Sequence, residues 1–116
     1  MLFLAGPAPP PPPPAAPLSR HCKTVEVRGA GVDGVNGLFV LVNRTSDGVA
    51  MYSKPDGDHQ IYRYDGRWKI AHIEHSDQVW YEQAHAQPDS HVPPSPEWHA
   101  TREWFTPAPL PLRCAD

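Results

Sequence analysis

The sequence lacks the features that place a protein in a membrane or on nucleic acid. No apolar run approaches the roughly 20 residues that a membrane-spanning helix requires. The apolar start, residues 1–5, is too short for a secretion signal and has no basic flank. Lys and Arg form no block, and the formal net charge is -3. Because there is no basic patch, we expect no binding to nucleic acid or to a membrane. These absences favour a soluble, cytoplasmic, monomeric protein.

Cysteine is scarce: the chain has Cys22 and Cys114 and no other. Each lies beside one end of the region that carries strand patterns. A bond between them would need an oxidising compartment. Because no secretion signal is visible, we favour two unpaired thiols in chain ends that stay outside the fold over a disulfide bond.

Proline, by contrast, is abundant, with 16 residues that lie mostly outside the strand patterns. Six of them are consecutive: Pro9, Pro10, Pro11, Pro12, Pro13 and Pro14. Such a run is preset to the polyproline II conformation and has no N–H groups to join a sheet. It is interpreted either as an inert low-complexity leader or as a ligand for an SH3, WW, EVH1 or profilin-like domain.

The middle of the chain alternates short strand patterns with Gly- and Asp-rich turns. These patterns predict strands at 24–28, 38–42, 49–54, 59–64, 67–73 and 79–82. The connections are too short for a crossover helix, so neighbouring strands should be antiparallel. We therefore expect an all-β fold, a single small antiparallel β-meander of five or six strands, closed by an irregular Pro/Trp-rich segment over 85–105. This domain would span 24–105, between a disordered proline-rich leader (1–23) and a flexible tail (106–116).

The core is predicted from the apolar positions of these strands. Residues 38–42 are apolar throughout, which predicts that both faces of that strand are covered. The expected core residues are Val25, Val27, Leu38, Val40, Leu41, Val42, Met51, Ile61, Trp68, Ile70 and Trp80. Trp98 and the pair Trp104-Phe105 would be costly to leave wet, and Trp98 is expected to pack back on the sheet.

Motifs for a dinucleotide site, a metal site or a catalytic nucleophile are either absent or have the wrong spacing. Residues 29–34 match G-x-G-x-x-G, but a turn and a strand follow instead of the helix that a dinucleotide site needs. His72 and His75 would face opposite sides of a strand, so they should not chelate a metal from it. No Ser or Cys lies in a nucleophile motif. We therefore predict no catalytic residue, no metal and no cofactor.

A three-residue sequence at one strand end matches the acceptor for N-linked glycans. Asn43-Arg44-Thr45 fits N-x-[ST] and could tolerate a glycan there. Because no secretion signal is visible, we interpret the match as chance.

Tyrosines are concentrated on the predicted strands. Tyr52, Tyr62, Tyr64 and Tyr81 could form an exposed platform that binds a peptide or another ligand. The alternative is that they pack the core, since a domain this small needs its aromatic residues inside.

The order of several short motifs over residues 25–98 resembles a small β-module of multidomain and uncharacterised eukaryotic proteins. The motifs are Val35-Asn36-Gly37-Leu38-Phe39, Met51-Tyr52-Ser53-Lys54, Ile61-Tyr62-Arg63, Arg67-Trp68-Lys69-Ile70, Trp80-Tyr81 and Pro93-Pro94 through Trp98. The resemblance implies the β fold and an interaction role, and it implies no catalytic residue or ligand.

Three functions stay open at this point. The first is a non-catalytic protein-interaction module. The second is a small-ligand protein or enzyme with a pocket between the sheet and residues 85–105, using His72, His75 or Glu74. The third is a structural spacer, or a fragment of a larger multidomain protein, in which every aromatic residue is buried.

Overall fold

A computed structural model describes residues 22–55, 57–73, 78–83 and 98–115. Over these residues the chain is all-β, with two single-turn 3-10 helices and no α-helix. The strands are β1 (Thr24–Val27), β2 (Gly37–Ser46), β3 (Val49–Ser53), β4 (His59–Tyr64), β5 (Arg67–His72), β6 (Val79–Gln83), β7 (Trp98–Ala100) and β8 (Arg113–Cys114). The 3-10 turns are η1 (Asp33–Val35) and η2 (Glu103–Phe105).

The strands form one sheet in the order β7-β6-β5-β4-β3-β2-β1-β8, and every pair is antiparallel. The predicted all-β antiparallel meander is therefore confirmed. The sheet has eight strands rather than five or six. The additional strands are short, with three residues in β7 and two in β8. Strands of that length leave no alternating pattern in the sequence.

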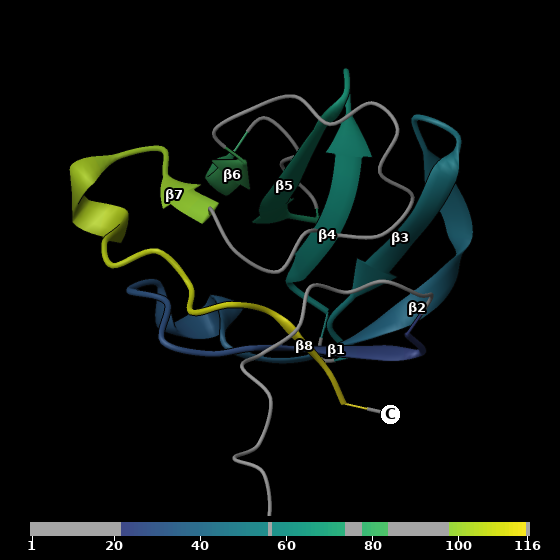
Figure 1. Cartoon of the computed structure of the whole chain (residues 1–116), viewed down its shortest axis with the longest axis horizontal. Coiled ribbons are helices and arrows are strands. Elements are labelled where there is room, and N and C mark those ends of the chain that lie inside the picture. The colour runs from purple at the N-terminus through teal and green to yellow at the C-terminus, as the bar shows by residue number, and fades with distance from the viewer. Residues whose placement is uncertain (1–21, 56, 74–77, 84–97, 116) are drawn as a thin grey trace, which may run out of the picture.

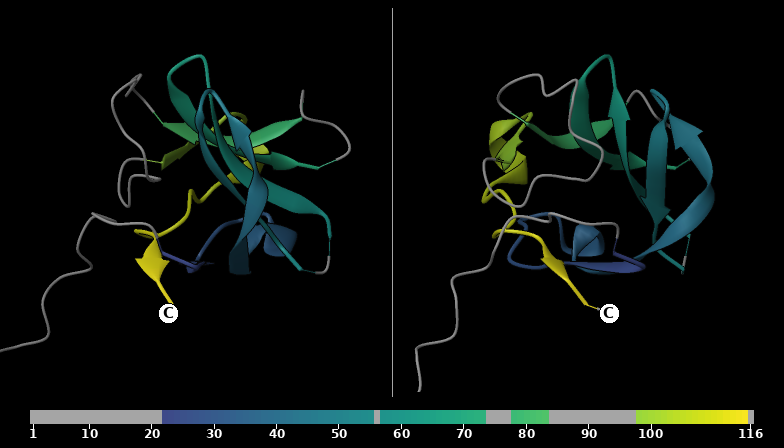
Figure 2. Two further views of the ribbon diagram at one scale, coloured as in Figure 1. Left: turned by 90° about the vertical axis from the view of Figure 1, so that its right-hand side faces the viewer. Right: turned by 45° about the vertical axis from the view of Figure 1, so that its right-hand side comes forward.

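The sheet curls into a half-barrel, which Figures 1 and 2 show from three directions. The chain after β7 runs from one edge of the sheet to the other, where β8 joins β1. Backbone bonds fasten this closing segment, which we define as residues 101–115. Gly31 N donates to Pro107 O at 2.8 Å, Leu110 N to Arg28 O at 2.9 Å, and Ala115 N to Thr24 O at 2.9 Å. The segment that closes the fold thus extends well past residue 105, through the stretch predicted to be a flexible tail.

Glycine is required where the closing segment approaches residues 29–34. A Cβ built on Gly31 would collide with the backbone carbonyl group of Thr106. Gly29 has φ +75, a conformation that side chains disfavour. Within this G-x-G-x-x-G sequence, Gly31 therefore permits a close contact between two backbone segments of a β fold.

Cys22 and Cys114 form a disulfide bond, with their Cα atoms 5.6 Å apart. The prediction of two unpaired thiols outside the fold is therefore wrong. Pairing of β8 with β1 places Cys114 opposite Val25, close enough to reach the buried Cys22. The prediction rested on the missing secretion signal, and the sequence pattern gave no hint of β8.

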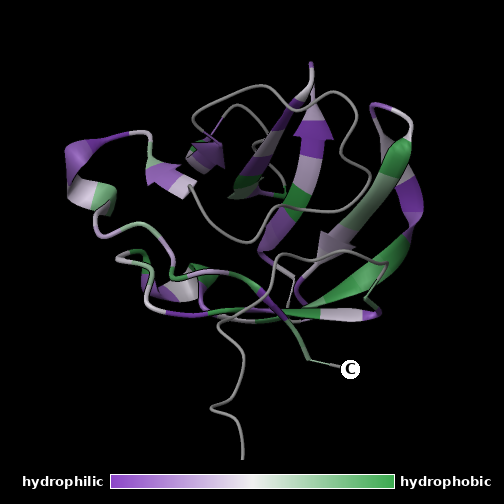
Figure 3. Ribbon diagram, viewed as in Figure 1, coloured by the Kyte–Doolittle hydropathy of each residue, from purple (hydrophilic) through white to green (hydrophobic). Residues whose placement is uncertain are grey.

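The main core fills the concave side of the curled sheet, and a smaller cluster of Met51, Tyr62 and Ala71 lies on its other face. Six predicted core residues are buried: Val25, Val27, Met51, Ile61, Trp68 and Ile70. Val40, Val42 and Trp80 are partly buried. Leu38 and Leu41 are wrongly predicted, because they are 48% and 40% exposed, while Phe39 between them is buried. Figure 3 shows the hydrophobic stretch of β2 on the right-hand side of the sheet. The expectation that both faces of this strand are covered does not hold.

Two hairpin turns are joined by the ion pair of Arg63 and Asp47. Arg63 Nε donates to Asp47 Oδ2 at 3.0 Å, and the Arg63 guanidinium also donates to Asp47 O at 2.9 Å. Gly66 N donates to Asp47 Oδ2 at 2.9 Å, which ties the β4–β5 turn to the β2–β3 turn. The Gly66 N–H, followed by Arg63, lowers the pKa of Asp47 from its ordinary 3.8.

Removal of the disulfide should weaken the fold. The bond closes a chain separation of 92 residues. We expect the Cys22→Ser, Cys114→Ser variant to lose about 2–5 kcal/mol of unfolding free energy, because its unfolded chain is less constrained. Urea unfolding of the oxidised protein and the variant measures this difference. Coincident unfolding curves would show that the bond does not hold the closing segment.

The pH dependence of stability should carry a contribution from Asp47. A carboxyl whose folded pKa is lowered stabilises the protein above its unfolded pKa, and this contribution is lost as pH falls through the folded value. We expect Asp47→Asn to melt below wild type at neutral pH and the gap to shrink below pH 3.8. Thermal melts across the acid range check this, with the exposed Asp58→Asn as the control. A gap that stays constant with pH would contradict the assignment.

Candidate functional site

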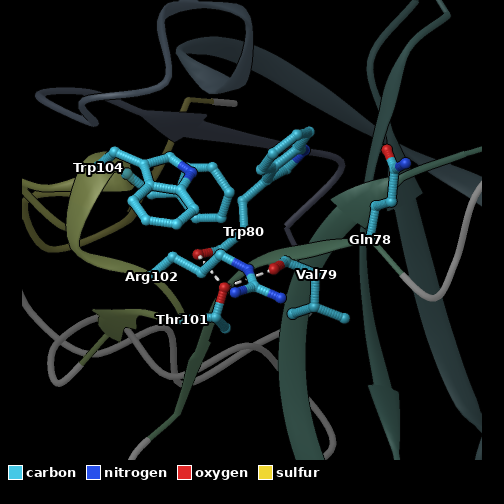
Figure 4. A pocket seen from close by; sticks show the side chains of 7 residues that line it. Gln78, Val79, Trp80, Thr101, Arg102 and Trp104 are labelled. Atoms are coloured by element: carbon cyan, nitrogen blue, oxygen red, sulfur yellow. Dashed lines mark hydrogen bonds between the residues drawn. The ribbon is translucent and has the colours of Figure 1, made fainter.

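A hollow of about 700 Å³ opens between β6 and the start of the closing segment. We call it the aromatic pocket, and Figure 4 shows it from close by. Its lining residues are Gln78, Val79, Trp80, Thr101, Arg102, Trp104 and Phe105. Three of these residues, one from the sheet and two from η2, are aromatic.

Backbone pairing and one threonine fix where the chain leaves the sheet beside this pocket. Tyr81 pairs with Ala100 across β6 and β7. Directly after β7, Thr101 N donates to Trp80 O at 3.0 Å. The Thr101 hydroxyl donates to Val79 O at 2.6 Å, as drawn in Figure 4. These bonds set the direction of the chain into η2, so that its aromatic side chains lie beside Trp80.

Tyr81 of β6 also holds η2 in position. Its ring is fully buried, and its hydroxyl donates to Phe105 O at 2.6 Å. The same oxygen accepts a hydrogen bond from Val32 N at 2.9 Å. Burial is the main cause that raises the pKa of Tyr81 above its ordinary 10.0, so the hydroxyl stays protonated and able to donate. One side chain therefore joins β6, residues 29–34 and η2.

The rings of the pocket meet at steep angles. The centroids of Trp80 and Phe105 are 4.6 Å apart with an interplanar angle of 88°. Those of Trp104 and Phe105 are 6.1 Å apart at 75°. Rings in this edge-to-face arrangement do not form one flat stacking surface. Trp104 is 74% exposed, which is unusual for so large an apolar side chain.

One cation stands beside these rings. The Arg102 guanidinium carbon lies 5.7 Å from the centre of the Trp104 ring, within range of a cation–π contact. Arg102 is the charged side chain among the lining residues that the structure describes. A positive charge on an aromatic surface favours ligands with exposed hydrogen-bond acceptors or negative charge.

The four tyrosines predicted as a platform do not come together on the surface. Tyr52, Tyr62 and Tyr81 are buried, while Tyr64 is 62% exposed. The alternative reading, in which the tyrosines pack the core, describes three of the four. Tyr52 donates its hydroxyl to Cys22 O at 2.8 Å, and burial raises the pKa of Tyr62. Tyr52 and Tyr81 belong to the main core, whereas Tyr62 lies on the other face of the sheet with Met51 and Ala71. Strand patterns alone did not predict the curl that sets these two faces.

Among the residues that the structure describes, the histidines of the hypothetical ligand pocket do not line the aromatic pocket. His72 lies on β5 opposite His59 of β4, with ring centroids 5.7 Å apart, and is absent from the pocket lining. Glu74 and His75 lie outside the described residues. Within those residues, no group of three His, Cys, Asp or Glu side chains is placed to hold a metal ion.

Sequence reasoning missed Gln78, Thr101 and Arg102 as site residues. The available signal was the pair Trp104-Phe105, which lies in a stretch without strand periodicity. Pro9–Pro14 fall outside the described residues. In the part of the chain that the structure describes, no helix is long and apolar enough to cross a membrane.

Comparison of the chain with protein-family models, with curated proteins and with solved structures gave no match. The resemblance to the small β-module therefore stays a prediction, and function has to be inferred from the pocket itself.

Loss of the Tyr81 hydroxyl should loosen the pocket. In Tyr81→Phe the partly buried Val32 N–H and Phe105 carbonyl each lose a partner, so we expect the unfolding free energy to fall by about 1–3 kcal/mol. Chemical denaturation measures this loss. The matched control is Tyr64→Phe, which removes a hydroxyl from an exposed ring and should leave stability unchanged. Equal stability of the two variants would contradict the positioning role of Tyr81.

Proposed function

We propose that the protein is a non-catalytic binding module that recognises a proline-rich segment of a partner protein at the aromatic pocket. The observation that carries this proposal is the set of three rings, Trp80, Trp104 and Phe105, packed at 75° to 88° with Trp104 exposed. Proline-rich segments are bound by aromatic-lined grooves, because their conformation is formed before binding and costs little entropy.

The shape of the pocket supports a proline ligand over a flat one. A polyproline II chain presents compact proline rings along a ridge, and these can pack against aromatic rings that are not coplanar. A ligand that stacks flat would need coplanar rings.

The polar groups of the pocket support the same ligand. A proline run has carbonyl acceptors and no N–H donors. Arg102, Gln78 and the Trp104 indole are all able to donate hydrogen bonds, and Figure 4 shows Arg102 and Trp104 close to each other along the pocket. The Arg102 charge would add affinity for an acidic residue beside the prolines.

The two other functions find less support. The described lining residues include no carboxylate, histidine or cysteine that could act as a base or nucleophile. A structural spacer would bury its large aromatic side chains, whereas Trp104 is largely exposed.

Binding of a proline peptide tests this proposal. The probe is a synthetic peptide of the chain's own residues 7–17. The protein is the full chain with Pro9–Pro14 replaced by serine, which removes competition from its own prolines. We expect saturable changes in tryptophan fluorescence and in the indole NMR signals. Trp104→Ala should weaken binding about tenfold or more, equivalent to about 1.4 kcal/mol.

The control for this titration is Tyr64→Ala, which removes an exposed ring on β4, outside the pocket lining. It should bind as tightly as the parent chain. A titration without a saturable response, or equal losses in the Trp104 and Tyr64 variants, would refute the proposal. Repeating the titration with the unaltered leader shows whether Pro9–Pro14 compete for the pocket within the same chain.

A further inference from the structure

The glycan acceptor sequence Asn43-Arg44-Thr45 lies at an irregularity of the sheet. Val42 pairs with Met51 and Thr45 pairs with Ala50, so Asn43 and Arg44 are two extra residues in β2 without partners on β3. Such a bulge bends the strand and re-aims its side chains. All three residues of the acceptor sequence are exposed.

The disulfide supplies an independent observation about compartment. Bonds such as Cys22–Cys114 form and persist in the endoplasmic reticulum lumen and outside the cell, and they are rare in the cytosol. The endoplasmic reticulum lumen is also where secreted proteins receive N-linked glycans. The acceptor sequence was interpreted as chance because no secretion signal is visible, and the same absence favoured a cytoplasmic protein with unpaired thiols. The thiols are paired, and this bond favours an oxidising compartment instead.

We infer that Asn43 is an N-glycosylation site of a protein that folds in an oxidising secretory compartment. The donor class is an oligosaccharide carried on a lipid pyrophosphate. The Asn43 amide nitrogen bonds to the anomeric carbon, and the bond from that carbon to the pyrophosphate oxygen breaks. The lipid pyrophosphate leaves with the electron pair, and the amide gives up one proton. Separately, the two thiols pass two electrons and two protons to the disulfide of a thiol oxidoreductase.

The surroundings of Asn43 have room for a sugar. A shallow hollow of about 370 Å³ is lined by Leu41, Val42, Asn43, Arg44, Thr45 and Ala50. Leu41 is 40% exposed there, so the first sugar residue would cover apolar surface that the fold leaves wet.

The glycan would leave the aromatic pocket open. Figures 1 and 2 show β2 on the side of the half-barrel away from β6, β7 and η2, which form the pocket. The inference therefore does not depend on the proposed function, and either could fail without the other.

Secretion of the full chain tests the inference. The chain is expressed in cultured mammalian cells behind a cleavable secretion signal, and the secreted protein is treated with peptide N-glycosidase. We expect one glycan on wild type, with Asn43 converted to Asp on release, as read by mass spectrometry. Thr45→Ser keeps the acceptor sequence and should be modified, whereas Thr45→Ala and Asn43→Gln should not. Thiol alkylation should find no free cysteine.

Two results would overturn the inference. One is a secreted, disulfide-bonded wild-type chain with unmodified Asn43. The other is retention of the glycosylated chain inside the cell while Asn43→Gln is secreted, because the glycan would then prevent correct folding. Thermal melts of Asn43→Gln and Thr45→Ala, expected to match enzymatically deglycosylated wild type, show that loss of the glycan is not loss of folding.

Discussion

The closure of a curled sheet by its own C-terminal segment is the constraint on which the rest of this structure depends. The hydroxyl of Tyr81 is central to it, because it bonds at once to Val32 N and Phe105 O. These bonds link β6 to residues 29–34 and to η2 across the open side of the half-barrel. Gly31 allows the closing segment to come near enough for its own bond to Pro107 O. The Tyr81 hydroxyl and the lack of a side chain at Gly31 thus both hold residues 29–34 against the closing segment.

One stretch of chain serves both the closure of the fold and the proposed binding pocket. Residues 101–105 supply most of the aromatic pocket, and β8 at the other end of the closing segment carries Cys114. Loosening of the segment at either end would change where Trp104 and Phe105 lie relative to Trp80. Tyr81, which does not line the pocket, holds it directly through its hydrogen bond to Phe105 O.

The sequence predicted local features well and contacts between distant segments poorly. Asp65-Gly66 and its alternating flanks predicted the β4–β5 hairpin, and Trp68 and Ile70 are buried as expected. The predicted binding residues were the four tyrosines, whereas the aromatic pocket is lined by residues 78–80, 101, 102, 104 and 105. The tyrosines were favoured because they lie on recognisable strands. Arg102 and Trp104 lie in a stretch without periodicity, so the sequence did not predict which side of the fold their side chains would face.

The sequence by itself determined the fold class, the order of β1 to β6 and part of the core, because alternation and turn residues act over a few neighbouring positions. Only the tertiary structure decided the Cys22–Cys114 bond, the exposure of Leu38 and Leu41, and the burial of Tyr52, Tyr62 and Tyr81. The physical reason is the curl of the sheet. It sets which face of each strand becomes concave, and it brings residue 114 beside residue 22 through contacts between segments far apart in the chain.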